Sequence, residues 1–196
     1  MAPRGYVDAG AYWYRLFNPR PVYIVASGGC GGAAFMAASW VTPVGEEPPR
    51  ILAALGRESH TLSVIRGRGC FTVNVLGVEH RDFIYTAGVV SGAEVDKASL
   101  LGARFSCDTV TGCPRLVEPR PLAVVEARVV RLVEDAAEDT VLVVGEVEAA
   151  YHEPGVFRRG WDLRRVRPAM HLYGRLFTTS DGVYAARRRG AGGGQV

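Results

Sequence analysis

Apolar residues gather in short β-branched runs, or alternate with polar ones, through the first half of the chain. These runs predict strands over residues 22–26, 35–44, 51–55 and 71–76. In the fourth strand, the alternation places Thr72 and Asn74 on the opposite face from Phe71. Glycines dominate the stretch between the first two strands, which predicts a turn or loop there.

Helical spacing interrupts these strands at two places. Ser59 can cap a helix that runs to about residue 66, with Leu62 and Ile65 on one face. Glycines just after this segment would end the helix. A second helix is expected over residues 78–86, and residues 96–101 should form a loop or a helical turn.

The second half of the chain contains longer apolar runs. Residues 122–133 and 140–151 are dominated by valine and alanine, and a short polar stretch joins them, which predicts an antiparallel hairpin. A last strand is expected over residues 172–179. About seven strands with two or three helices between them predict a mainly β fold, a barrel or a sandwich, and not a parallel sheet.

These elements suggest one domain with an extension at each end. Residues 1–18 are rich in aromatic side chains and predict a packed N-terminal arm, residues 19–180 form the domain, and residues 181–196 are expected to be a disordered tail. The 196 residues fit the size of a single domain.

Charge and hydropathy exclude several classes of partner. The net charge is +3, and basic and acidic residues balance once the tail residues Arg187, Arg188 and Arg189 are set aside. The domain therefore shows no basic excess for a nucleic acid. No apolar run approaches the ~20 residues that span a bilayer, and the first residues lack a signal-peptide core. We expect a cytoplasmic protein with no nucleic-acid or membrane partner.

Four cysteines, Cys30, Cys70, Cys107 and Cys113, contain no C-x-x-C pair and no zinc-ligand spacing with the histidines. No metal site is expected. Buried free thiols are the preferred interpretation, and a short Cys107–Cys113 disulfide is the alternative.

The sequence contains one match to the dinucleotide-binding fingerprint. Gly29, Gly31 and Ala34 match G-x-G-x-x-A directly after the first strand. The helix that this motif requires would have to end before Pro43 and would include Trp40, Val41 and Thr42, which favour strands. We therefore interpret the glycines as a flexible hairpin tip.

Two segments on either side of the strand over residues 51–55 carry candidate chemistry. Small side chains over residues 37–44 would let a flat ligand approach the backbone, although composition alone favours a core strand with Trp40 packed inside. Arg57, Ser59, His60 and Thr61 cluster at a helix N-terminus. That cluster suits a phosphate monoester, and plain helix capping with Arg57 in solvent is the alternative. A flat ring joined to a phosphate is the shape of FMN.

Over about residues 19–178, the chain resembles the flavin reductase-like, FMN-binding split-barrel family. The resemblance rests on six segments in this order: PVYIVAS, AASWVTP, PPRILAALG, SHTLSVIRGRGCFTVNVLG, VLVVGEVEAAY and HLYGRLF. The family includes flavoredoxins, archaeal ferric reductases and the reductase components of two-component monooxygenases. The resemblance implies a split β-barrel homodimer that passes electrons from NAD(P)H through FMN to free flavin, ferric complexes or an electron-transfer protein.

The resemblance also implies which residues contact FMN. Those expected along the isoalloxazine ring are Met36, Ala37, Ala38, Ser39, Trp40, Val41 and Thr42. Those expected at the ribityl chain and phosphate are Gly56, Arg57, Ser59, His60 and Thr61, with Arg57 countering the phosphate charge. Tyr173 and Phe177 belong to a late strand that approaches the ring in some members, and His171 beside them is expected to be structural.

The chain departs from the family pattern at three positions. Ala34 and Ala37 stand where members often have Asn and Thr, and Thr140 stands where many reductases have a histidine near the nicotinamide. These differences favour a flavoredoxin-like carrier or a ferric reductase over a monooxygenase partner.

Two alternatives remain open. One is a non-catalytic flavin- or tetrapyrrole-binding module. The other is a pyridoxamine-phosphate-oxidase-like enzyme, which would need a second phosphate pocket from Arg66, Arg68 or Arg104.

Overall fold

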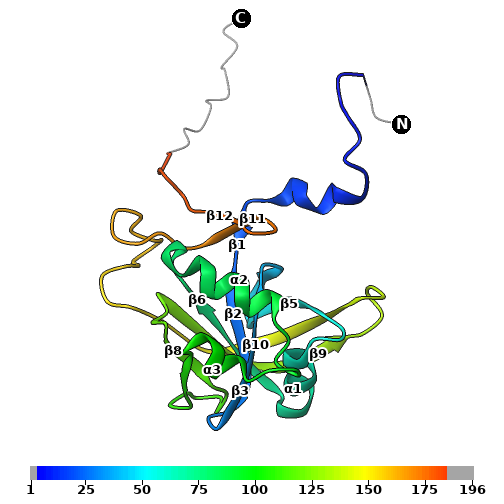
Figure 1. Ribbon diagram of the computed structural model, residues 1–196. Coiled ribbons are helices and arrows are strands. Elements are labelled where there is room, and N and C mark those ends of the chain that lie inside the picture. Colours follow the sequence, from blue (N-terminus) through cyan, green and yellow to red (C-terminus); the bar gives the residue numbers. More distant parts are fainter. Residues whose placement is uncertain (1–3, 185–196) are drawn as a thin grey trace, which may run out of the picture.

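The computed structural model describes residues 4–184, and its centre is one seven-stranded antiparallel sheet in the order β3-β2-β6-β9-β10-β5-β4 (Figure 1). The expected tail lies largely outside the described residues. The strands of this sheet are β2 (Tyr23–Gly29), β3 (Gly32–Ala38), β4 (Val41–Glu46), β5 (Pro49–Gly56), β6 (Cys70–Val75), β9 (Ala123–Val133) and β10 (Thr140–His152). The predicted hairpin of the second half is confirmed as β9 and β10.

The connection between β3 and β4 shows how the sheet closes. These strands are the two outermost ones, yet only Ser39 and Trp40 separate them in the sequence. Two residues can join opposite edges only if the sheet curls until those edges meet. The backbone N–H of Ala54 on β5 donates to the Trp40 carbonyl across 2.8 Å at this meeting point. The expected mainly β, split-barrel fold is thus confirmed.

The dinucleotide-binding interpretation is excluded by the same sheet. The glycine-rich segment is a tight connection between antiparallel β2 and β3, with Gly29 opposite Gly32, and no helix follows β2. The strand preference of Trp40, Val41 and Thr42, which follow the glycines, had already predicted that no helix would form here.

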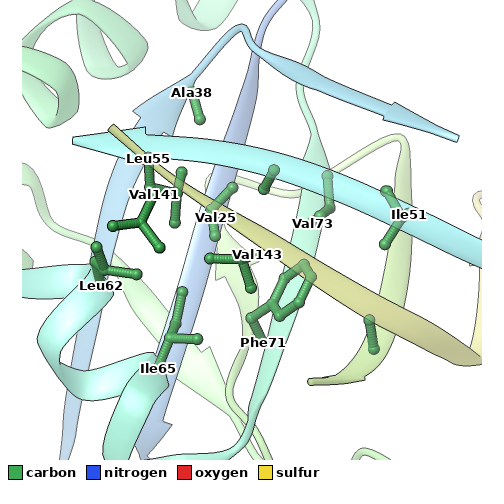
Figure 2. Close-up of a cluster of buried hydrophobic side chains, with 12 residues drawn as sticks. Val25, Ala38, Ile51, Leu55, Leu62, Ile65, Phe71, Val73, Val141 and Val143 are labelled. Atoms are coloured by element: carbon green, nitrogen blue, oxygen red, sulfur yellow. The ribbon is translucent and has the colours of Figure 1, made fainter. Parts of the chain in front are cut away.

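Helix α1 (His60–Arg68) covers one opening of the barrel. The Ser59 side chain accepts a hydrogen bond from the Leu62 N–H, and Gly69 ends the helix with a left-handed φ of +71°. Leu62 and Ile65 are fully buried and point into the core formed by Phe71, Val73, Val141 and Val143 (Figure 2).

A second core lies on the other side of β2 and β6. Its elements are η2 (Val78–His80), α2 (Arg81–Val89), α3 (Lys97–Leu101) and the paired strands β7 (Arg104–Ser106) and β8 (Arg115–Glu118). The polar face of β6 is buried beneath this layer, so Thr72 and Asn74 are both 0% exposed. Thr72 Oγ1 donates to the Pro114 carbonyl across 2.7 Å, and Asn74 Oδ1 accepts from the Leu116 N–H across 2.9 Å. These bonds compensate for the loss of water at both side chains.

Two expectations about the ends of the domain were wrong. The predicted last strand is a small hairpin, β11 (Met170–Tyr173) and β12 (Leu176–Thr178), which turns at Gly174 with a φ of +52°. Strand β1 (Arg20–Pro21) pairs with β11. The N-terminal arm forms η1 (Gly10–Phe17), which has no buried residue and lies beyond the sheet in Figure 1. It is not packed as expected, because most of its aromatic side chains find no core among residues 4–184.

The expectation of free thiols was also wrong. Cys30 pairs with Cys107 and Cys70 pairs with Cys113, so the alternative Cys107–Cys113 bond does not form either. Both disulfides attach the segment between α3 and β8 to the sheet, over sequence separations of 77 and 43 residues. Such pairing depends on the tertiary fold, and cysteine spacing alone cannot give it.

The described residues contain neither a membrane-spanning helix nor a cluster of metal ligands. Every helix there is too short or too polar to span a bilayer. Residues 4–184 contain no group of three or more His, Cys, Asp or Glu side chains arranged to hold a metal ion.

Candidate functional site

Three adjoining clefts lie along β3, between the N-terminus of α1 and the β11–β12 hairpin. The first cleft, of about 240 Å³, lies between α1 and the segment that follows α2. The second, of about 360 Å³, shares Gly88 and Val89 with the first. The third, of about 130 Å³, shares Ser39 and His171 with the second. We call these three clefts together the groove.

The α1 end of the groove is lined by Glu58, Ser59, His60 and Thr61, and Glu58 is exposed to solvent. The first N–H groups of an α-helix have no partner inside the helix, and the helix dipole makes this end positive. Ser59 satisfies the N–H of Leu62 across 3.3 Å. The N–H groups of His60 and Thr61 therefore remain for a ligand, and an anion suits them best.

Lys97 adds a positive charge to the same end. Its ammonium donates to the carbonyl oxygens of Phe35 and Ala87 across 2.9 and 3.0 Å. The side chain is 6% exposed, and no salt bridge among the described residues involves it. Burial lowers the pKa of this ammonium below its ordinary value. An ammonium has three protons, so one remains after the two carbonyls, and a bound anion would also compensate for the buried charge.

Gly92 separates Lys97 from His60. A Cβ built at Gly92 would lie 3.3 Å from His60 Cδ2 and 3.7 Å from Lys97 Cε. The two side chains therefore converge on one small volume, where any larger residue at position 92 would crowd both.

The middle of the groove has a mostly apolar floor. Met36 and Ala37 of β3 line it, together with Ile84 and Gly88 of α2. Gly88 packs closely on β3, since a Cβ there would lie 3.3 Å from the Ala37 Cβ. Ala38 instead belongs to the barrel core and is 8% exposed.

Aromatic side chains surround the far end of the groove. Trp40 is 43% exposed, and its ring stands edge-on to Tyr14 of η1 with centroids 6.2 Å apart. The His171 and Phe177 rings lie 5.2 Å apart, and His171 Nε2 is 3.1 Å from the Gly174 carbonyl oxygen. Tyr173 contributes to the same wall.

The structure thus gathers nine of the expected residues on the groove: Met36, Ala37, Ser39, Trp40, Ser59, His60, Thr61, Tyr173 and Phe177. Five others do not line it: Ala38, Val41, Thr42, Gly56 and Arg57. Val41 and Thr42 belong to a separate apolar cleft of about 440 Å³.

Arg57 faces the β9–β10 turn and not the helix N-terminus. Its Nε donates to the Glu138 carbonyl across 2.8 Å, and its Nη1 donates to a Glu134 carboxylate oxygen across 3.0 Å. Its Nη2 also donates to the Glu134 and Ala137 carbonyls. The expected phosphate role of Arg57 is therefore not supported by this geometry, because the guanidinium is already paired.

The arginines considered for a second phosphate pocket are also paired. Arg66 donates to the Glu134 carboxylate across 2.9 and 3.1 Å, Arg104 forms a salt bridge with Glu118, and Arg68 donates to the Gly112 carbonyl. These three contacts lie on separate surfaces and do not converge on one pocket.

Sequence reasoning missed Lys97 and the segment 87–92, which precedes it in the chain and lines the same end of the groove. One signal for Lys97 was present, because it is the single lysine among 23 basic residues. Nothing in the pattern linked Lys97 to the helix N-terminus at Ser59, because the position of Lys97 beside that helix depends on how α2 and α3 pack on β3.

Comparisons with known proteins agree with this fold. The chain matches the family described as flavin reductase like domain over residues 14–180. The Escherichia coli (strain K12) protein YddH is 31% identical over 171 residues, which are 85% of this chain and 89% of that protein. The crystal structure of flavoredoxin from Methanosarcina acetivorans is 25% identical, with a TM-score of 0.78 and 98% of both chains covered.

A third similar structure is that of an FMN-binding protein from Thermus thermophilus with bound 1-cyclohex-2-enone. It is 20% identical, with a TM-score of 0.77, and the match covers 95% of this chain and 99% of that one. At this identity the likeness supports the fold.

Proposed function

Because the chain belongs to the flavin reductase-like family, we propose that it binds FMN in the groove and passes electrons from NAD(P)H through the flavin to an acceptor. The acceptor would be free flavin, a ferric complex or an electron-transfer protein. The observation that carries the proposal is the groove itself, which joins an anion-suited end to a flat apolar floor.

The residues present fit the phosphate of FMN. The N–H groups of His60 and Thr61 and the ammonium of Lys97 would hold it, with the Ser59 hydroxyl at the same helix end. The buried, uncompensated charge of Lys97 is the strongest support, because a phosphate dianion would supply the missing counter-charge.

The backbone of β3 suits the edge of the isoalloxazine ring. β3 is an outer strand, and the Phe35 carbonyl on its free side accepts from Lys97. Backbone groups in a strand alternate between its two sides, so those of Ala37 also face the free side. They would bind the ring's polar edge, and the small Ala37 side chain would allow close approach.

When bound, FMN supplies the hydride- and electron-transfer chemistry. The groove residues hold the cofactor and shield it: Trp40, Phe177 and His171 form the aromatic wall near one end, and Met36 forms part of the floor. No side chain is required to act as an acid or base on the reacting atoms.

Lys97→Met tests the phosphate site. We expect FMN to bind about 10- to 100-fold more weakly, the scale of a lost charged hydrogen bond of ~1.5–3 kcal/mol. Affinity in the unsubstituted protein should fall as pH rises through the lowered pKa of Lys97, and this dependence should be absent in Lys97→Met. FMN fluorescence quenching measures both, with Arg68→Met, at the other end of α1, as the control. Equal affinities in all three proteins would remove Lys97 from the site.

Anaerobic spectra test the electron donor. The flavin band of the FMN-loaded protein near ~450 nm should bleach on addition of NADH or NADPH. A band that persists with both donors would contradict the donor we propose and would favour reduction by another protein.

We also propose that the chain forms a homodimer. Tyr12, Trp13, Leu16 and Phe17 of η1 are 60–75% exposed, and an apolar cleft beside Val41 is open to solvent. Exposed apolar area of this kind is typical of an interface. Sedimentation equilibrium should give twice the chain mass of 21.1 kDa, and a monomer at micromolar concentration would contradict the proposal.

A further inference from the structure

The tip of the β2–β3 hairpin is held to the rest of the molecule by the Cys30–Cys107 disulfide. Four glycines, at positions 28, 29, 31 and 32, surround Cys30. Gly28 has a φ of +103°, and a Cβ there would lie 3.0 Å from the Gly32 carbonyl oxygen, so the tip needs glycine to turn. A glycine-rich tip gains the most freedom when its anchor is removed.

The two disulfides differ sharply in exposure. Cys70 and Cys113 are 1% and 0% exposed, and the Cys113 sulfur lies 3.7 Å from the buried Ser27 hydroxyl. Cys30 is exposed and Cys107 is half-buried. Since thiol–disulfide exchange requires a thiolate to reach a sulfur atom, only the Cys30–Cys107 bond is open to attack in the folded protein.

The exposed disulfide is one of three contacts that join the β2–β3 hairpin to residues 97–107. The Phe35 carbonyl accepts from Lys97, and the Phe35 ring lies 5.0 Å from that of Phe105. Cys30–Cys107 is the covalent member of this series. Its loss would leave β3 and Lys97, which line the groove together, connected by noncovalent contacts.

The buried Cys70–Cys113 disulfide does not connect the hairpin tip to this segment. The loop around Cys113 is also held by Thr109, whose hydroxyl donates to the Cys113 carbonyl across 2.7 Å, and by Thr111, whose N–H donates to the buried Glu126 carboxylate across 3.1 Å. Breaking the Cys30–Cys107 bond therefore releases the hairpin tip while the loop keeps its attachment to the sheet.

We propose that Cys30–Cys107 is a reversible redox modification site that exchanges with dithiols, and that its state tunes the affinity of the groove for FMN. In the exchange, one thiolate of the dithiol attacks a sulfur of the pair and forms a mixed disulfide. The second thiolate then displaces the remaining cysteine. The protein gains two electrons and two protons as two thiols, and the dithiol becomes a disulfide. The FMN part rests on the proposed function, and the exchange part does not.

Differential alkylation tests the exchange. The native full-length protein is treated with increasing dithiothreitol, alkylated with iodoacetamide and analysed by peptide mass spectrometry. Cys30 and Cys107 should be labelled at least ~10-fold faster than Cys70 and Cys113, because access controls the rate. Equal rates, the reverse order, labelling before any reductant is added, or no labelling short of unfolding would each overturn the exchange site.

FMN titration tests the tuning. Reduction should raise the dissociation constant on the order of five-fold, within the usual range of coupling between two sites. The Cys30→Ser variant should match the reduced protein and no longer respond to dithiothreitol, and Cys107→Ser should behave in the same way. Unchanged affinity in all forms would overturn the tuning while leaving the alkylation result intact. If the unsubstituted protein binds no FMN at all, the proposed function fails, and the alkylation order still decides the exchange site.

Discussion

Gly145 of β10 lies where the sheet has no room for a side chain, and its replacement with alanine should destabilise the protein. A Cβ at this position would lie 2.7 and 2.8 Å from Cε1 and Cζ of Phe71 and 2.9 Å from the Cβ of Ala127. Both neighbours are 0% exposed. Carbon atoms pack at about 3.5–4.0 Å, so the Phe71 ring would have to move by roughly 0.8 Å inside a filled core.

The expected cost follows from two opposing effects. Overpacking of a core costs about 1–3 kcal/mol. Alanine also leaves the unfolded chain with less backbone freedom than glycine does, and this effect stabilises the folded state by about 0.5–1 kcal/mol. The free energy of unfolding of Gly145→Ala should therefore fall by about 1–2 kcal/mol, as measured by urea denaturation under oxidising conditions that keep both disulfides intact.

A double-mutant cycle makes the prediction refutable. Phe71→Leu removes the ring atoms that the new Cβ would meet, so the double variant should be more stable than the sum of the single effects by at least ~0.5 kcal/mol. Gly160→Ala is the control, since a Cβ there meets no atom within 4 Å. Strict additivity, or a Gly145→Ala variant as stable as the control, would refute the packing argument.

Three further predictions follow from local contacts. Arg57→Ala should leave FMN affinity in a fluorescence titration unchanged and lower stability by about 1 kcal/mol, because its guanidinium binds Glu134 in a partly exposed site; weaker FMN binding would return Arg57 to the site. Arg115→Gln should raise the pKa of Asp108 from about 2 toward 3.8 in a carboxyl NMR titration, since the two hydrogen bonds from Arg115 hold it down. In the unsubstituted protein this depressed pKa stabilises the fold above pH 3.8, and the contribution is lost as pH falls through about 2. An unshifted pKa in the variant would contradict the assignment. Ser59→Ala should cost about 1 kcal/mol in thermal unfolding by removing the α1 cap, whereas Ser59→Asp should keep most of the stability; equal losses in both variants would argue against capping.

Local sequence patterns predicted the elements whose own residues determine them. The valine-rich runs of β9 and β10 and the cap at Ser59 are of this kind, because hydrophobic periodicity and helix-end chemistry act within a few residues. The β11–β12 hairpin was missed because its turn needs only Gly174. The split-barrel closure came from the family resemblance and not from the periodicity, which left a sandwich equally open.

In the candidate site, too, local features could be predicted from the sequence and tertiary contacts could not. Ser59, His60 and Thr61 could be placed together at one end of the groove because a helix N-terminus is a local feature with its own chemistry. The direction of the Arg57 side chain could not be predicted in this way, because its partner, Glu134, lies 77 residues later in the sequence. Lys97 was missed for the same reason, since its carbonyl partners come from β3 and α2.

The meeting of β3 and β4 at Trp40 has a consequence for how the protein behaves in crowded solution. An uncovered outer strand offers a row of N–H and C=O groups to which a foreign strand can add. Along β3 that row is interrupted by Lys97, whose ammonium binds the Phe35 carbonyl. Along β4 it is interrupted by Pro43 and followed by acidic residues and prolines at 46–49, which repel or cannot pair with an incoming strand. The same chain segments that form the groove and close the barrel thus also oppose strand-by-strand aggregation.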